Sequence, residues 1–221
     1  MAKRIRHSVS KLAGASSQAC WNEVFAETLD YRQNKSFNYL IDRTLYRPRE
    51  IIQFCTDAVE EARKERLEPP INYGVITRAE NRYSEERAKD IAAEYRFQYP
   101  GLMSIFDVFR GRQYSMTKDE LELICLGIST GEYGIAKEAS AWAVNQDPEL
   151  MIDVLWRIGF LRAQAVGGIK ATRRSGSSYV GPHQISNLNL RNVPRFQVHP
   201  MFRSFLGMKE ARETPADTTT S

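Results

Sequence analysis

A helix that begins at Pro48 is the feature that most constrains how this chain can fold. Proline suits the first helical turn, because its missing N–H costs nothing there and its φ angle is already helical. Apolar side chains then recur at helical spacing and would share one face: Ile51, Cys55, Ala58, Val59 and Ala62. Polar residues occupy the opposite face, so we expect this helix to cover a hydrophobic core and to expose its polar side.

Three arginines, Arg43, Arg47 and Arg49, lie at the start of this helix. The positive end of the helix dipole does not stabilise cations. Their presence there predicts an anionic partner, either a carboxylate on a neighbouring acidic helix or a phosphate.

The composition is that of a globular protein outside the membrane. The chain has 221 residues, of which 42% are hydrophobic and 26% charged, which is ordinary for a soluble domain with a core of its own. No apolar run approaches the roughly 20 residues that span a bilayer. No apolar signal core follows the basic first residues. We therefore expect a cytoplasmic location and no membrane partner.

Cysteine and histidine usage gives no sign of a metal site. Cys20, Cys55 and Cys125 are an odd and widely spaced set, which indicates reduced and buried thiols instead of a disulfide framework. No cysteine or histidine pair has the spacing of zinc ligands. We expect no metal and no cofactor.

The charge is distributed unevenly along the chain. From Val154 through Lys209 there is no aspartate or glutamate. Residues 154–221 hold ten basic and three acidic residues, a net +7, which leaves −3 for the remainder of a chain with a net charge of +4. A basic C-terminal third on a mildly acidic body predicts an anionic partner for that third, either nucleic acid or an acidic protein surface.

Local signals predict helices over most of the chain before Gly159. Capping-box spacing places helix starts at Thr77 (with Glu80) and at Thr117 (with Glu120). Asp147 before Pro148 predicts another helix start. The remaining helices are expected at Cys20 to Leu29, Phe37 to Thr44, Leu102 to Arg110 and Ile135 to Val144, with a short one at Met201 to Leu206.

Beyond Gly159 the pattern indicates strands. Phe160 to Val166 and Ile169 to Arg173 would pair through a turn at Gly167-Gly168, and Arg195 to His199 is a further strand. In a winged helix-turn-helix, short helices are followed by a β-ribbon. The predicted strand pair, with its glycine turn and its arginines, fits that order. In that arrangement residues 148–158 form the recognition helix.

Seven residues of this basic region are candidates for contact with nucleic acid: Arg157, Arg162, Lys170, Arg173, Arg174, Tyr179 and Arg191. Cations beside a Gly/Ser tip can reach phosphates, which gives affinity but little sequence information. Glu149 and Asp153 on the recognition helix would repel a phosphate backbone, so we expect weak, largely non-specific contact. The alternative is a basic surface that docks on an acidic partner or on the chain's own acidic helices.

Motifs for catalysis are absent from the sequence. There is no phosphate-binding G-x-x-x-x-G-K-[ST], no G-x-G-x-x-G after a strand, no H-E-x-x-H and no G-x-S-x-G. Adjacent carboxylates such as Glu60-Glu61 and Glu85-Glu86 fall on polar helix faces. We do not expect this chain to be an enzyme.

Several short motifs resemble a set of bacterial P-loop ATPases akin to the AAA-like, KAP and STAND groups. The resemblance covers roughly Arg4 to Leu206 and lies in the portion that follows the ATPase core. It is carried by Trp21 with Phe25, Arg43 through Phe54, Ala79-Glu80 with Tyr83-Ser84, Glu94-Tyr95, Tyr99-Pro100, Leu155-Trp156 with Gly159 to Leu161, and His199-Pro200.

This resemblance implies a mainly α chain in which a helical lid-like bundle precedes the winged-helix domain. The lid would span 18–100 and the winged helix 101–207, between a flexible N-terminus (1–17) and a disordered tail (208–221). Arg43, Arg47 and Arg49 would form a sensor-like element, with Arg47 or Arg49 near the nucleotide's γ-phosphate, a role that suits a permanently charged guanidinium.

The chain departs from this family in one large respect. It has no phosphate-binding loop and no acidic strand to hold Mg²⁺, so the arginines would sense a nucleotide only in trans, on an ATPase-core partner chain. Three hypotheses follow: a non-catalytic C-terminal module of a P-loop ATPase, a stand-alone winged-helix regulator that binds DNA, and a protein-interaction adaptor.

Overall fold

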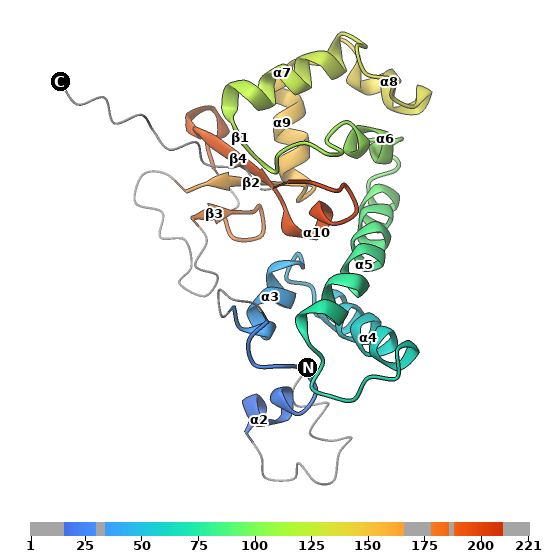
Figure 1. Cartoon of the computed structure of the whole chain (residues 1–221). Coiled ribbons are helices and arrows are strands. Elements are labelled where there is room, and N and C mark those ends of the chain that lie inside the picture. The colour runs from blue at the N-terminus through green and yellow to red at the C-terminus, as the bar shows by residue number, and fades with distance from the viewer. Residues whose placement is uncertain (1–15, 30–33, 166–177, 186–187, 210–221) are drawn as a thin grey trace, which may run out of the picture.

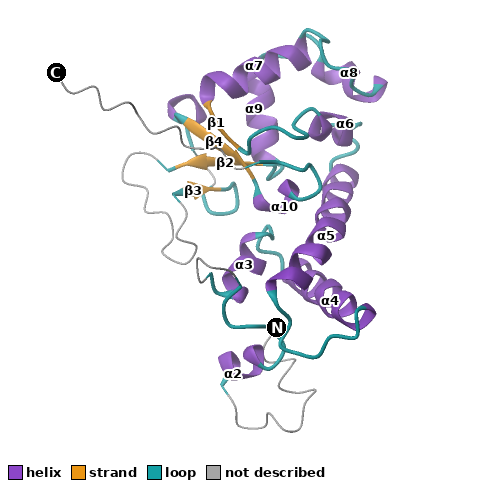
Figure 2. Ribbon diagram, in the orientation of Figure 1, coloured by secondary structure: helices purple, strands orange, loops and turns teal. Residues whose placement is uncertain are grey.

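The protein was analysed as a computed structural model, which describes residues 16–29, 34–165, 178–185 and 188–209. Helices dominate the described residues, and a small antiparallel sheet lies in the C-terminal half (Figures 1 and 2). The α-helices are α2 (Ser17–Asn22), α3 (Ser36–Asp42), α4 (Pro48–Lys64), α5 (Tyr73–Glu94), α6 (Leu102–Asp107), α7 (Lys118–Ser129), α8 (Lys137–Ala143), α9 (Pro148–Arg157) and α10 (Pro200–Arg203). The strands are β1 (Ser115–Thr117), β2 (Leu161–Gln164), β3 (Tyr179–Val180) and β4 (Arg195–Val198), and a 3₁₀ turn, η2, spans Leu190–Asn192.

The sheet has the strand order β1-β4-β2-β3, with antiparallel pairing throughout. Met116 of β1 lies opposite Phe196 of β4, and Phe196 also lies opposite Ala163 of β2. Strand β1, which precedes α7 in the sequence, therefore forms the edge of a sheet whose other strands, β2, β3 and β4, follow α9. Helices α7 and α9 pack against each other and against this sheet.

Two hydrophobic clusters share the long helix α5. The first joins α2, α3, α4 and the N-terminal part of α5, with Phe54 stacked on Tyr83 at 4.3 Å between ring centroids. The second takes in Ala88 and Ile91 from the C-terminal part of α5, together with α6 to α10 and the sheet. In Figure 1, α5 runs from the lower helices up to the sheet-bearing half. The boundary at residues 100 and 101 stays a prediction.

Local signals placed several element ends correctly. The capping box at Thr117 is present, because its hydroxyl accepts from the Glu120 N–H and the Glu120 carboxylate accepts from the Thr117 N–H. Asp147 caps α9 ahead of Pro148. Gly159 adopts φ +83°, the left-handed conformation expected after a helix.

Two expected helix boundaries were wrong by four residues or more, and others differ by up to three. The helix expected through Leu29 ends at Asn22, because the chain then pairs with a distant segment, with the Ala26 N–H donating to the Ile71 carbonyl. The helix expected from Thr77 begins at Tyr73, where the Asn72 side chain caps it by accepting from the Val75 N–H.

Strand β1 was not predicted at all. Of the expected ribbon, β2 covers Leu161–Gln164 and β4 covers Arg195–Val198. The expected return strand at Ile169 to Arg173, its turn at Gly167-Gly168, and most of both termini lie outside the described residues.

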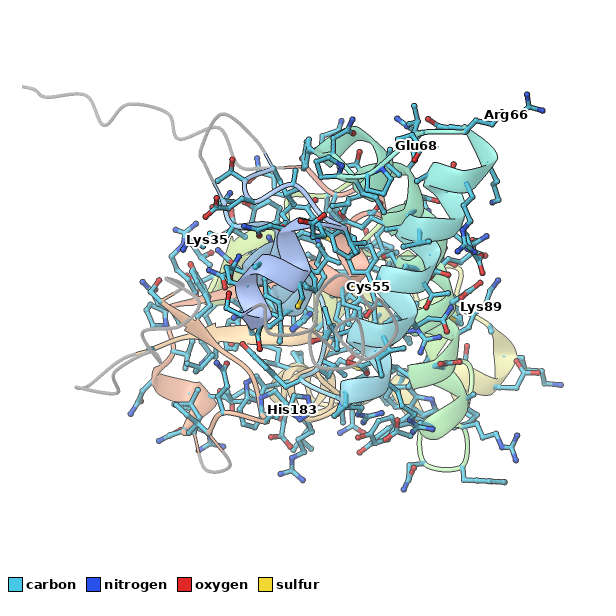
Figure 3. The ribbon with its side chains drawn as sticks, turned by 90° about the horizontal axis from the view of Figure 1, so that it is seen from below. Lys35, Cys55, Arg66, Glu68, Lys89 and His183 are labelled. Atoms are coloured by element: carbon cyan, nitrogen blue, oxygen red, sulfur yellow. The ribbon has the colours of Figure 1, made fainter. Side chains whose placement is uncertain are left out.

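The three cysteines are buried and unpaired, as predicted. Burial raises the pKa of the Cys55 and Cys125 thiols to about 12, so neither is a reactive thiolate near neutral pH. Figure 3 shows Cys55 on the inner side of α4, whereas Lys89 of α5 points outward. None of the described helices combines the length and apolar character needed to cross a bilayer.

Candidate functional site

Arg43 follows α3 and is enclosed by aromatic and acidic side chains. Its guanidinium lies 3.4 Å from the centroid of the Tyr39 ring, and its Nε donates to Glu80 Oε1 at 2.7 Å. The Tyr39 hydroxyl donates to the other carboxylate oxygen of Glu80 at 2.6 Å. Burial raises the pKa of Tyr39, and the adjacent Glu80 carboxylate raises it further. Arg43 thus forms an ion pair that joins the C-terminal end of α3 to α5.

Arg47 forms an ion pair at the surface. It lies directly before α4, and its two terminal nitrogens donate to both oxygens of Glu94, at 2.7 and 3.0 Å. This bidentate contact lowers the pKa of the Glu94 carboxyl. His183 is near the N-terminal end of α4 (Figure 3), and burial lowers its pKa.

Arg49 differs from the other two arginines of this segment. Its side chain is exposed. Among the described residues it enters none of the ion pairs that hold Arg43 and Arg47. Of the three arginines at the start of α4, it is therefore the one whose charge is available to an external anion without breaking a contact.

Arg162 was a candidate for nucleic-acid contact, and the structure places it in the interior. It is 2% exposed, and its guanidinium donates to Asp42 Oδ1 at 2.9 Å and to the Tyr179 carbonyl at 3.2 Å. The residue connects β2 both to the C-terminal end of α3 and to β3. Its charge is offset within the protein and does not contribute to a basic surface.

His199 lies between β4 and α10, close to Arg162. It is 4% exposed, and its Nδ1 accepts from the Met201 N–H at 3.2 Å, which caps α10. Burial holds the pKa of His199 well below its usual value, and the nearby cations Arg162 and Arg203 lower it further. The side chain is therefore neutral in the folded protein.

Because the folded His199 resists protonation, folding should weaken in acid. Below about pH 6.5 the unfolded chain takes up a proton that the folded chain does not, so stability falls by at most about 1.4 kcal/mol per pH unit from this group. We expect His199→Asn, which keeps a side-chain cap for α10, to flatten the dependence of unfolding free energy on pH between about 5 and 6.5. Urea titrations at several pH values measure this. If the unfolding free energy changed with pH equally in both proteins, the assignment to His199 would be contradicted.

The exposed candidates at α9 are paired with acids. Arg157 lies 2.8 Å from Asp153, and Arg191 lies 3.0 Å from Glu149, which also contacts Lys118 at 3.4 Å. The outward face of α9 is thus close to electrically neutral. This is a poor surface for attracting a phosphate backbone.

The remaining nucleic-acid candidates are only partly covered by the structure. Tyr179 lies in β3 and is half-buried. Lys170, Arg173 and Arg174 lie outside the described residues, so the structure does not place them.

Of the two partners predicted for the arginines before α4, the carboxylate of an acidic helix is confirmed for Arg43 and Arg47, whose acids lie on α5. The sequence did not identify which carboxylates these are. Glu80 was assigned to a capping box, Glu94 was named only for the family resemblance, and Asp42 received no role. Within the part of the chain that the structure describes, no three or more His, Cys, Asp or Glu side chains gather in a way that could hold a metal ion.

Comparison with known proteins gives a match to a family model and a match to a curated protein. A family model described as the FunZ-associated C-terminal helical domain matches residues 1–92. The putative transposon gamma-delta 80.3 kDa protein of Escherichia coli (strain K12) is 23% identical over 224 residues, which cover 96% of this chain and 30% of that protein. No solved structure matches. The chain thus spans about a third of the curated relative, neither match names a P-loop ATPase, and the first 92 residues are similar to a C-terminal helical domain.

Proposed function

We propose that this chain acts as a non-catalytic C-terminal module of a larger P-loop ATPase, in which a helical lid is followed by a winged-helix domain. The family model that matches residues 1–92 is described as a C-terminal helical domain, which supports a C-terminal module. The chain covers 30% of a longer relative, which supports a part of a larger protein. The ATPase core itself is inferred from the motif resemblance of the arginine segment and its neighbours.

The observation that carries the winged-helix part of the proposal is the pairing of β1 with β4. A winged helix places a short strand between its first two helices, and that strand extends the ribbon formed after the recognition helix. Here β1 separates α6 from α7, and β2 and β4 follow α9. In this assignment α9 is the recognition helix.

Arg49 is the residue that we assign to the nucleotide of the core. Arg43 is held by Glu80 inside the protein, and Arg47 would have to leave Glu94. Arg49 needs no such rearrangement. An exposed guanidinium that approaches a γ-phosphate in the transition state stabilises its developing charge, an effect worth about 10³- to 10⁵-fold in related phosphoryl transfers.

The test is reconstitution with the P-loop core encoded in the same reading frame or the adjacent gene. ATP hydrolysis by that core should rise at least about tenfold when the full chain is present, and Arg49→Ala should remove most of the increase. Arg63→Ala is the matched control, since Arg63 is an exposed arginine on the same helix. A rate that is unchanged by the chain, or equally lowered by both variants, would refute the proposal.

DNA contact through residues 166–177 is a second candidate function. It is favoured by the basic balance of residues 154–221 and by the printed name of the relative, a transposon protein. Fluorescence anisotropy measures the affinity of the full chain for a 30-base-pair DNA duplex. This affinity should drop steeply as the salt concentration rises, and it should be lower in the double variant Arg173→Ala/Arg174→Ala. Binding that is independent of salt and of both arginines would exclude it.

A further inference from the structure

Helix α7 exposes leucines on the side opposite its core face. Its inward stripe, which includes Leu121 and Cys125, is buried, but Leu123 is 67% exposed and Leu126 46% exposed. Asp119 and Thr130 are also exposed. The four exposed residues Asp119, Leu123, Leu126 and Thr130 are thus spaced by four, three and four positions, as on one face of a helix. Two large apolar side chains are therefore held side by side on a rigid helix in contact with water.

Hollows flank this pair of leucines on both sides. One, of about 700 Å³, lies between α7 and the segments around Met116 and Tyr133. The Tyr133 ring can approach α7 because Gly127 has no side chain: a Cβ there would lie 2.6 Å from the ring. The other hollow, of about 490 Å³, lies between α7 and Pro148 at the start of α9. Leu123 and Leu126 line both, so they form a ridge between two grooves.

Acidic side chains surround the ridge. The residues lining the two hollows include six carboxylates: Asp119, Glu120, Glu122, Glu132, Asp147 and Glu149. The one cation among the residues that line them, Arg112, is engaged with the Val108 carbonyl and the Tyr133 hydroxyl. Among the described residues, Asp119 and Glu132 form no ion pair, whereas Glu122 and Glu149 contact Lys118.

We propose that this leucine ridge and its acidic rim bind a basic amphipathic helix of a partner protein. A helix with apolar residues at i, i+3 or i+4, and i+7 can seat side chains in the grooves beside Leu123 and Leu126. Its lysines or arginines then meet the carboxylates on either side, which speeds association and selects the partner. The proposal concerns a different surface from Arg49 and stands independently of the ATPase assignment.

Charge excludes two other occupants. Lys118 and Arg191 offset part of the rim's charge through Glu122 and Glu149, but the six carboxylates still outnumber these two cations and Arg112, so a phosphate backbone is repelled from this face. In a two-fold symmetric dimer the same patch meets itself, which would bring the two acidic rims together. A basic partner is the occupant that the rim attracts.

The test uses the full chain and a fluorescein-labelled synthetic 18-residue peptide of leucine and lysine, with the leucines at helical amphipathic spacing. A peptide of the same composition with alternating leucine and lysine is the control ligand. Fluorescence anisotropy should give saturable binding of the amphipathic peptide only.

The double variant Leu123→Ser/Leu126→Ser should weaken this binding at least about tenfold, as for central contacts of an interface. Asp119→Lys/Glu132→Lys should weaken it and reduce its dependence on salt.

Leu67→Ser is the matched control, since Leu67 is 44% exposed and follows α4, away from the ridge. It should bind the peptide as the parent does. All four altered positions of the ridge and rim are on the surface, and circular dichroism verifies that each variant is folded. Hydrogen exchange should show new protection in 118–129 on binding. Unchanged affinity in the ridge variant, protection elsewhere, or a self-dimer that Leu123→Ser/Leu126→Ser dissociates would each overturn the proposal.

Discussion

Replacing Glu80 by alanine is expected to lower the free energy of unfolding by about 3–5 kcal/mol, because removing one partner of a buried ion pair leaves the other uncompensated. Glu80 is 7% exposed and accepts from both Arg43 Nε and the Tyr39 hydroxyl. Without it, Arg43 keeps its charge but loses the carboxylate that its guanidinium contacts, and keeps the Tyr39 ring and the Tyr39 carbonyl as contacts. Urea denaturation followed by circular dichroism measures the loss.

Glu85→Ala on the same helix is the control. Glu85 forms an exposed pair with Lys89 at 2.6 Å, and such pairs contribute less than about 1 kcal/mol. A double-mutant cycle with Arg43→Ala should then give a large coupling energy for Arg43 and Glu80, since the two side chains are in direct contact. A loss below about 1 kcal/mol for Glu80→Ala would mean that the pair is not buried as described.

Replacing Phe160 by alanine should be comparably damaging, at about 3–5 kcal/mol, through lost burial and the cavity left behind. Phe160 is fully buried, and its ring centroid lies 4.6 Å from that of Phe106 and 5.0 Å from those of Phe109 and Phe202. It therefore fills the space between α6, the start of β2 and α10. The control is Phe97→Ala, at a side chain that is 84% exposed.

Guanidinium denaturation of Phe160→Ala also reports on domain organisation. If the two hydrophobic clusters, which share α5, unfold together, the variant shows one unfolding transition with its midpoint at a lower guanidinium concentration. If residues 18–100 and 101–207 unfold independently, only one of two transitions moves. A loss no greater than in Phe97→Ala would contradict the central packing of Phe160.

The parts of the fold that were predictable are those set by residues close in sequence. Thr117 with Glu120, and Asp147 before Pro148, define helix starts by contacts within four residues, and both were predicted. Strand β1 has three residues and is defined by pairing with β4, about eighty positions later. Nothing in its own sequence distinguishes it from a loop, because its hydrogen-bond partners come from the distant strand.

The candidate site shows the same division between local and distant information. The positions of Arg43, Arg47 and Arg162 were recognised from composition and helix polarity. Their carboxylate partners are 37, 47 and 120 residues away. The basic C-terminal third was recognised as well, but its charge count could not reveal that Arg162 is buried. The leucine ridge did leave a signal, since Leu123 and Leu126 fall outside the core-facing stripe of their own helix.

The claim that this chain carries no nucleotide site of its own is tested most directly by titrating Mg·ATP into the purified full chain in an isothermal calorimeter. The account predicts no saturable heat up to about 1 mM nucleotide, the upper end of ordinary substrate affinities. Saturable one-to-one binding with a dissociation constant below about 10 μM would contradict it.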